Sequence, residues 1–199
     1  MRNAIARFLQ YLRAERNASD FTIKSYGEDL DALVEYLSES SGGPLPSPGA
    51  ITVSDLRGYV SALHAAGYAK ATIARRLASL RSFFRFGQRE GWTTSNPAKP
   101  LRNPRRSRTL PHFLSTDELG RLLQAPDAAS PMGLRDRAIL ETSYSAGLRV
   151  SEVVGLCDGD LDFAAGLVRV RGKGRRERLS PVGTYAARAL KQWLRVRKL

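Results

Sequence analysis

The chain has 199 residues, which is long enough for one large or two small domains with hydrophobic cores of their own. Its 32 lysine and arginine residues outnumber 19 acidic ones, and the resulting net charge of +13 points to a polyanionic partner. With one cysteine the chain forms no internal disulfide, and with neither an apolar signal region nor a run of about 18 apolar residues it is expected to be cytoplasmic, without a membrane span.

Residues 1–95 are predicted to form a helical bundle, because apolar residues recur there at helical spacing. The first two helices are indicated by residues three or four positions apart: Ile5, Phe8, Leu9 and Leu12, then Leu30, Leu33, Val34 and Leu37. The sequence from Thr52 to Asp55 is typical of the capping box that begins a helix. A fourth helix is indicated from about Ile73 to Gln88. Four helices with short connections predict a four-helix bundle.

Basic residues are concentrated in the second half of this bundle and just beyond it. Residues 57–108 hold twelve bases and one acid, Glu90, whereas residues 1–56 hold five bases and eight acids. A charged run is usually a solvated face, and this reading suits the mixed first half. The shortage of counter-charges in the second half favours contacts with phosphates. We therefore expect the fourth helix to contact DNA through four bases: Lys70, Arg75, Arg76 and Arg81.

The segment at residues 96–112 is predicted to be a linker between domains at 1–95 and 113–199. It alternates basic residues with Pro97, Pro100, Pro104 and Pro111, and such a segment is too stiff to collapse and too charged to bury. A plain spacer would not need so many cations. We therefore expect it to follow a phosphate backbone through four arginines: Arg102, Arg105, Arg106 and Arg108.

Residues 142–152 contain the first candidate catalytic residue. Gly147 follows an apolar helical run and supplies the left-handed residue that ends a helix. Arg149 then falls at the start of a second helix, predicted from Val150 to Leu156 with apolar positions that include Val150 and Val154. There its fork of donors joins free N–H groups to make a phosphate site. Glu152 is placed to cap that helix or to hold the guanidinium, and Cys157 is expected in a core. The alternative is a hinge whose arginine makes a surface salt bridge.

Residues 167–181 predict a β-hairpin with a lysine at its tip. Leu167 to Arg171 alternates apolar and basic residues, and Gly172-Lys173-Gly174 makes the turn into a returning strand. A lone Gly-Lys-Gly is more commonly a plain turn. However, residues 163–180 hold six bases against one acid, which favours anion binding. Two of these bases, Arg175 and Arg176, are expected to contact DNA.

Together these motifs resemble a known family. The sequences Gly147-Leu148-Arg149-Val150-Ser151-Glu152, Asp160-Leu161-Asp162, Gly172-Lys173-Gly174 and Arg176-Glu177-Arg178-Leu179-Ser180-Pro181 are similar to the first arginine box and lysine hairpin of the tyrosine recombinases, or phage integrases. They are most similar to the bacterial Xer type, and the resemblance covers nearly the whole chain. It implies a mainly helical fold with a small antiparallel sheet: a SAM-like core-binding bundle that clamps DNA, then the N-terminal part of an α+β catalytic domain.

The resemblance implies site-specific recombination of DNA through a 3′-phosphotyrosyl intermediate. Arg149 would bind the non-bridging oxygens of the scissile phosphate, and Lys173 would protonate the 5′-oxygen leaving group. No cofactor is implied, and no metal, since His64 and His112 have no partner at metal-ligand spacing. The resemblance also adds backbone contacts at the start of the second helix: Thr22, Lys24 and Tyr26. The implied partners are a duplex recombination site, a homo- or hetero-tetrameric synapse and a DNA translocase, at a nucleoid-associated location.

The family pattern continues with a His-x-x-Arg box, a further His or Trp and a nucleophilic tyrosine, which we do not find. Tyr185 lies too close behind the hairpin to match the nucleophile, and Trp193 reads as a core residue. We therefore expect a recombinase cut short, inactive by itself. The alternative is a natural, non-enzymatic truncation that occupies recombination sites or regulates a full-length recombinase. An RNA-binding protein would explain the charge but not the paired motifs.

Overall fold

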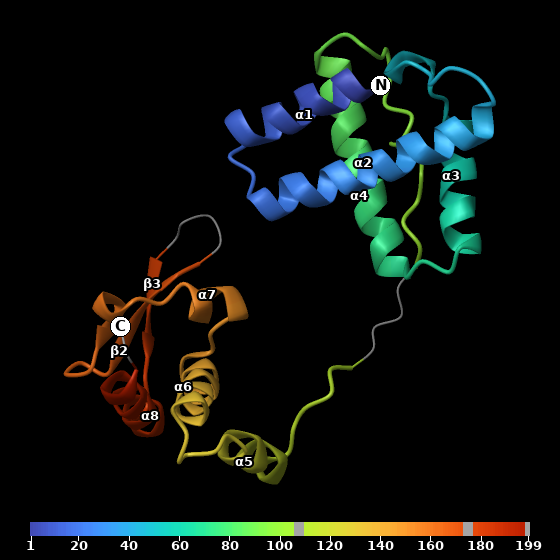
Figure 1. Cartoon of the computed structure of the whole chain (residues 1–199). Coiled ribbons are helices and arrows are strands. Elements are labelled where there is room, and N and C mark those ends of the chain that lie inside the picture. Colours follow the sequence, from blue (N-terminus) through green and yellow to red (C-terminus); the bar gives the residue numbers. More distant parts are fainter. Residues whose placement is uncertain (106–109, 173–176, 198–199) are drawn as a thin grey trace. The chain divides into compact units, whose positions relative to one another are not determined.

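A computed structural model describes residues 1–105, 110–172 and 177–197 of the chain (Figure 1). The chain divides into two compact units, Met1–Thr109 and Leu110–Leu199. The first unit is helical, and the second combines helices with a small antiparallel sheet, which confirms the predicted fold class. In the described ranges, no helix has the length and apolar character that a membrane crossing requires.

All four predicted helices of the first unit are present: α1 (Arg2–Ala14), α2 (Asp20–Ser41), α3 (Val53–Ala65) and α4 (Lys70–Arg89), with a 3₁₀ turn at Pro48–Ala50. Their apolar stripes meet in one core that includes Phe8, Leu30, Leu56 and Phe83. The predicted capping box begins α3, because the Thr52 hydroxyl accepts from the Asp55 N–H and the Asp55 carboxylate accepts from the Thr52 N–H. Local capping and burial of one face per helix therefore produce this bundle.

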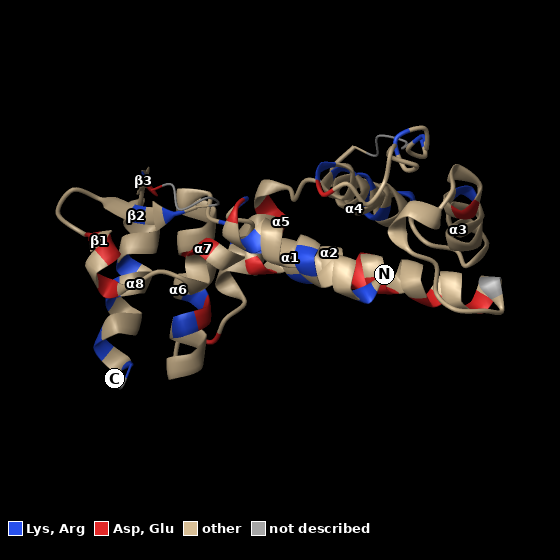
Figure 2. Ribbon diagram, turned by 90° about the horizontal axis from the view of Figure 1, so that it is seen from above, with Lys and Arg blue, Asp and Glu red and all other residues tan. Residues whose placement is uncertain are grey.

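Helix α4 contacts each of the other three helices of the unit. Its apolar residues Ile73, Leu77, Leu80 and Phe84 are almost completely buried, at the spacing that the sequence predicts. The remaining face carries the bases, which appear as blue bands along α4 in Figure 2. The helix that we expect to face DNA is therefore also packed against every other helix of its unit.

The segment after α4 packs on the bundle, contrary to the expectation that residues 96–112 are too charged to bury. Ala98 and Leu101 are buried in the core of the first unit. The Arg81 guanidinium donates to the Leu101 carbonyl over 2.5 Å and to the Asn103 side chain over 3.0 Å. Asn96 in turn donates to the Arg81 carbonyl over 3.0 Å. Two apolar residues between the cations, Ala98 and Leu101, thus allow the first half of the predicted linker to dock.

The second unit contains α5 (Thr116–Gln124), α6 (Pro131–Ala146), α7 (Val150–Val154), a 3₁₀ turn (Asp158–Asp160), β1 (Leu161–Asp162), β2 (Leu167–Arg171), β3 (Glu177–Pro181) and α8 (Thr184–Val196). The described strands form an antiparallel sheet in the order β1-β2-β3. Helices α6 and α8 lie side by side (Figure 1) and bury Ala138, Ala189 and Leu190 between them. This packing provides the support on which the candidate site is built.

The predicted hairpin is confirmed by β2 and β3. Val168 and Val170 are fully buried, while Arg169 and Arg171 between and after them are exposed. The pairing places Val170 opposite Arg178 and Arg171 opposite Glu177. The alternation of apolar and basic residues therefore reports the two faces of the strand, as a period of two requires.

Two expectations for the region after Arg149 are wrong. Helix α7 is only five residues long, and its side chains Val150 and Val154 are about four fifths exposed. Cys157 is exposed rather than part of a core. The chain leaves the helix at Gly155, and the backbone N–H of Cys157 donates to the Asp160 carboxylate over 3.0 Å. The turn thus uses the backbone of Cys157 and leaves its side chain outside.

Candidate active site and nucleic-acid interface

Arg149 stands at the junction of α6 and α7, as predicted. Gly147 has the left-handed conformation, with φ 60° and ψ 43°, and its N–H donates to the Ser143 carbonyl to close α6. Arg149 is then the extended residue immediately before α7, with φ −75° and ψ 154°. Its side chain is 74% exposed. The left-handed glycine thus turns the chain so that an arginine begins the next helix.

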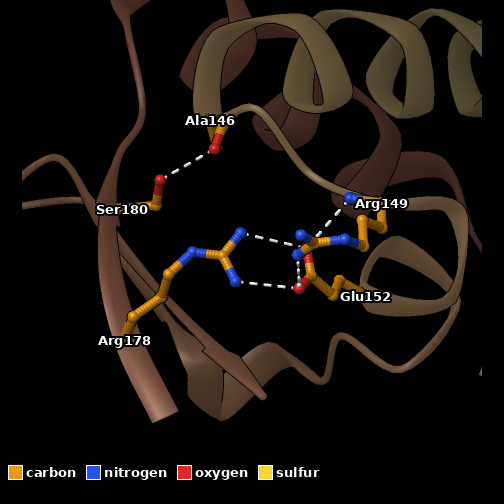
Figure 3. A network of polar contacts seen from close by, with 5 residues as sticks. All are labelled: Ala146, Arg149, Glu152, Arg178 and Ser180. Carbon is orange, nitrogen blue, oxygen red and sulfur yellow. Dashed lines mark hydrogen bonds and ion pairs between the residues drawn. The ribbon is translucent and has the colours of Figure 1, made fainter. Parts of the chain in front are cut away.

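Glu152 holds Arg149 at two points (Figure 3). Its Oε2 accepts from the backbone N–H of Arg149 over 2.9 Å, and its Oε1 accepts from Nη1 of Arg149 over 3.0 Å. The Glu152 side chain is only 2% exposed. Both roles considered for this residue, capping the helix and holding the guanidinium, are therefore observed together.

A second arginine reaches the same carboxylate from the sheet. Arg178 on β3 donates from Nη1 to Oε1 of Glu152 over 2.8 Å and from Nη2 to Oε2 over 3.0 Å (Figure 3). These bonds, followed by the bond from the Arg149 N–H, lower the pKa of Glu152 to about 2. Two arginines thus share one ionised, buried carboxylate, so the three side chains together keep one net positive charge.

Strand β3 is joined to the end of α6 by two further bonds. The Ser180 hydroxyl donates to the Ala146 carbonyl over 2.8 Å in a buried position (Figure 3). Beyond the strand, the Gly183 N–H donates to the Ser145 hydroxyl over 2.7 Å. Arg178 and Ser180 are two positions apart and so lie on one face of the strand. The turn that carries Arg149 is therefore built on β3.

These contacts were not predicted from the sequence. Arg178 is one of the six bases of residues 163–180, and Ser180 was expected only as part of the returning strand. Their spacing of two residues shows that they share a face, but only the fold shows that this face meets the Arg149 turn.

The other leg of the hairpin has a similar anchor. Arg171 on β2 donates to both carboxylate oxygens of Asp160, over 2.8 and 3.1 Å, and the Asp160 side chain is 3% exposed. Arg171 also donates to Glu177 across the strands over 3.2 Å. Each leg therefore binds a buried carboxylate through a bidentate arginine. Three predicted site residues between the legs lie outside the described residues: Lys173, Arg175 and Arg176.

The candidate DNA contacts of α2 lie at and near its first turn. The Thr22 N–H donates to the capping Ser19 hydroxyl over 3.4 Å. Lys24 is exposed and lies 4.0 Å from Glu28. Tyr26 is half-buried, and its ring stacks on Phe8 at 6.3 Å between centroids. Lys24 thus forms an exposed ion pair with Glu28, while Tyr26 contributes part of its ring to the core, and the DNA contacts expected of these residues stay predictions.

The bases of α4 differ in their surroundings. Lys70 is exposed at the first position of the helix. Arg75 donates to Asp29 over 2.7 Å and remains 44% exposed. The Arg76 side chain is only 14% exposed, and it donates to the Tyr59 hydroxyl over 3.1 Å. Arg75, Arg76 and Arg81 therefore have structural partners within the unit, and the DNA contacts expected of all four bases stay predictions.

The structure describes two of the four linker bases that we expect to contact DNA. Arg102 and Arg105 are exposed. Arg106 and Arg108 lie outside the described residues. Across residues 1–105, 110–172 and 177–197, no group of three or more His, Cys, Asp or Glu side chains is arranged to hold a metal ion.

Two family matches cover most of the chain. Residues 5–91 match the phage integrase N-terminal SAM-like domain, and residues 112–199 match the phage integrase family. Tyrosine recombinase XerC of Pelotomaculum thermopropionicum is 45% identical over 195 residues, covering 96% of this chain and 63% of the relative. XerC of Oceanobacillus iheyensis is 40% identical, covering 94% and 60%. The chain thus spans less than two thirds of the length of these relatives.

Solved structures share the fold at lower identity. A lambda integrase(75-356) dimer bound to a COC' core site gives a TM-score of 0.74 at 20% identity, covering 96% of this chain and 66% of that one. The Tn1549 transposon integrase in complex with circular intermediate DNA gives a TM-score of 0.70 at 21% identity, covering 98% and 65%. With the fold, the arginine box and the family matches in agreement, the chain belongs to the phage integrase family of tyrosine recombinases.

Proposed function

We propose that the chain binds duplex DNA at a recombination site and supplies the first arginine and the lysine of a site-specific recombinase. The observation that carries this proposal is Arg149. Its guanidinium is 74% exposed, yet it is oriented from behind by a buried carboxylate that a second arginine neutralises. Arg178 commits both terminal nitrogens to this carboxylate, whereas Arg149 commits one and presents its other donors to solvent.

The chemistry follows from the charges of a phosphodiester under attack. A tyrosine hydroxyl loses its proton as its oxygen bonds to phosphorus, and the 5′-oxygen leaves with the electron pair of the broken P–O bond. Arg149 offers planar donors to the non-bridging oxygens, whose charge grows in the transition state. Lys173 would give its proton to the departing 5′-oxygen, since a guanidinium does not release a proton in a protein.

The first unit would hold the duplex by its phosphates. The exposed bases Lys24, Lys70, Arg102 and Arg105 are placed for such contacts. Solved structures of this fold include DNA complexes, among them a lambda integrase tetramer bound to a Holliday junction. We therefore propose a duplex recombination site as the partner, a tetrameric synapse as the working assembly, a DNA translocase as a further partner, and a nucleoid-associated, cytoplasmic location.

Membership of the family makes the reaction class that of a tyrosine recombinase, but the 199 residues contain no His-x-x-Arg sequence. Tyr185 is 70% exposed in the first turn of α8, only four residues after β3 ends at Pro181. We propose that a polypeptide of residues 1–199 binds DNA without forming a covalent link to it, because no tyrosine occupies the nucleophile's place.

A nicked suicide duplex that carries a family core site tests both the proposed DNA binding and the proposed lack of a covalent link. We expect a complex on a native gel that duplex competitor removes and single-stranded RNA does not, and no protein–DNA adduct on a denaturing gel. Preference for RNA would contradict the proposed partner. An adduct mapped to Tyr185 would contradict the proposed lack of a nucleophile.

A further inference from the structure

The two arginines that share Glu152 differ in exposure. The Arg178 side chain is 39% exposed, and its two terminal nitrogens both bind the carboxylate. The Arg149 side chain is 74% exposed and uses one terminal nitrogen, Nη1, for the same carboxylate. Since a guanidinium has five N–H donors, most of the Arg149 donors remain available.

The charge of the carboxylate explains why two arginines are needed. A buried carboxylate must be paired, and Glu152 is 2% exposed. If Arg149 were its sole partner, the pair would be neutral and Arg149 would be drawn toward Glu152. With the bidentate Arg178 in place, Glu152 is already neutralised, and the charge of Arg149 is free for a phosphate.

Strand β3 also fixes the position from which Arg178 acts. The Ser180 hydroxyl binds the Ala146 carbonyl, next to the Gly147 that turns the chain toward Arg149. Arg178, on the same face of the strand, binds the carboxylate that orients Arg149 itself. The strand therefore sets both ends of the turn.

We propose that Arg178 is a positioning residue: it neutralises and fixes Glu152 so that Arg149 faces outward, oriented and with its charge available to a phosphate. The inference rests on the proposed DNA binding. It assigns Arg178 a role different from that of a further phosphate contact, and the two roles predict different outcomes.

A double-mutant cycle that measures affinity for a duplex core site distinguishes the positioning role of Arg178 from a direct phosphate contact. We expect Arg149→Gln to lower affinity about tenfold and to reduce the salt slope by about 0.9. In an Arg178→Gln background, Arg149→Gln is expected to change affinity by less than about twofold. Without Arg178, the Arg149 guanidinium already pairs with Glu152 and no longer contributes to phosphate binding. Effects that simply add would overturn the proposal.

Arg178→Lys sharpens the comparison. Lysine keeps the positive charge for a phosphate contact but cannot bind both oxygens with a planar fork. We expect it to behave like Arg178→Gln in the cycle, and wild-type behaviour would contradict the positioning role. Arg171→Gln is the matched control, because it removes an equivalent bidentate bond to Asp160 and leaves Glu152 untouched. Its effect is expected to add to that of Arg149→Gln.

A measurement without DNA tests the positioning itself. The carboxyl ¹³C signal of Glu152 should titrate at higher pH in Arg178→Gln and Arg178→Lys than in the wild type, and the Arg149 side-chain ¹H–¹⁵N signal should shift with it. Unchanged signals would refute the positioning role. If duplex DNA binds none of the proteins while these signals move, the proposed function fails and the positioning role stands. Urea unfolding identifies any variant that is too unstable to use. If Arg178→Gln is such a variant, Arg178→Lys replaces it in both measurements.

Discussion

Glu152 keeps its charge with almost no exposed surface, and this makes the second unit sensitive to acid. Its pKa in the folded protein is about 2, against an ordinary value of 4.5. Because the folded pKa is lowered, the ionised carboxylate stabilises the fold fully above about pH 4.5, and this stabilisation is lost as the pH falls toward 2. We expect the free energy of unfolding to decrease across that window.

Urea unfolding of the wild type and of Glu152→Gln, at pH values from 6 to 2, isolates this residue from the other carboxylates. The difference in unfolding free energy between the two proteins should be constant above pH 5 and should shrink below it. A difference that does not change with pH would mean that folding does not lower the pKa of Glu152. Arg149 and Arg178 remain in both proteins, so the comparison reports the carboxylate alone.

Lys173 can be tested in a full-length recombinase that carries this sequence. Lys173→Ala should slow cleavage of ordinary DNA by roughly 10²–10⁴-fold while binding is nearly unchanged, because the 5′-oxygen leaves poorly without a proton. Replacing that oxygen by sulfur gives a leaving group that needs no proton, and the variant should recover most of its rate. Arg149→Ala should not recover, since it acts on the non-bridging oxygens. Equal defects of Lys173→Ala on both substrates would exclude the proton-donor role.

Residues were predictable from sequence where local geometry decides their role. Gly147, Arg149 and Glu152 lie within six positions, so a turn and a cap define their relation. The partner of Glu152 was not predictable, because Arg178 is 26 positions away and only the packing of β3 brings it close. The same holds for Arg75 and Asp29, which are 46 positions apart. Charge counts show that bases are present but not which carboxylates they face.

At the scale of the elements, the segment that follows α4 extends the first unit beyond the four predicted helices. Ala98 and Leu101 are buried beside α4, and Arg81 binds the backbone of this segment. The periodic helices were predictable because they repeat one pattern over many residues. The packing of this short segment was not predictable, because two apolar residues among prolines and cations show neither helical nor strand periodicity.

Leu101 gives a direct measure of this packing. Leu101→Ala should lower the free energy of unfolding of the first unit by about 2–3 kcal/mol, because it removes buried side-chain atoms from a core. Leu110→Ala is the matched control, since Leu110 is 91% exposed and its loss should change stability by less than about 0.5 kcal/mol. Urea unfolding measures both. Equal effects of the two changes would show that Leu101 does not belong to the core.

For the molecule as a whole, the positive charge predicts how binding depends on salt. If about eight cations engage phosphates, a plot of log K against log salt for duplex DNA should have a slope of roughly −7, because each contact releases counterions. Fluorescence anisotropy over a range of salt concentrations measures the slope. A slope near zero would contradict a clamp formed by many backbone contacts, whatever the affinity at one salt concentration.

The exposure of Cys157 has a practical consequence. It is the only cysteine of the sequence, and its side chain lies at the surface of the second unit. A maleimide dye therefore attaches at a single position without any mutation, five residues beyond Glu152 in the sequence. With an acceptor dye at one end of a duplex, energy transfer would report how far the second unit lies from the DNA end while the protein binds. The natural sequence thus supplies its own labelling site for following the approach of the unit to DNA in real time.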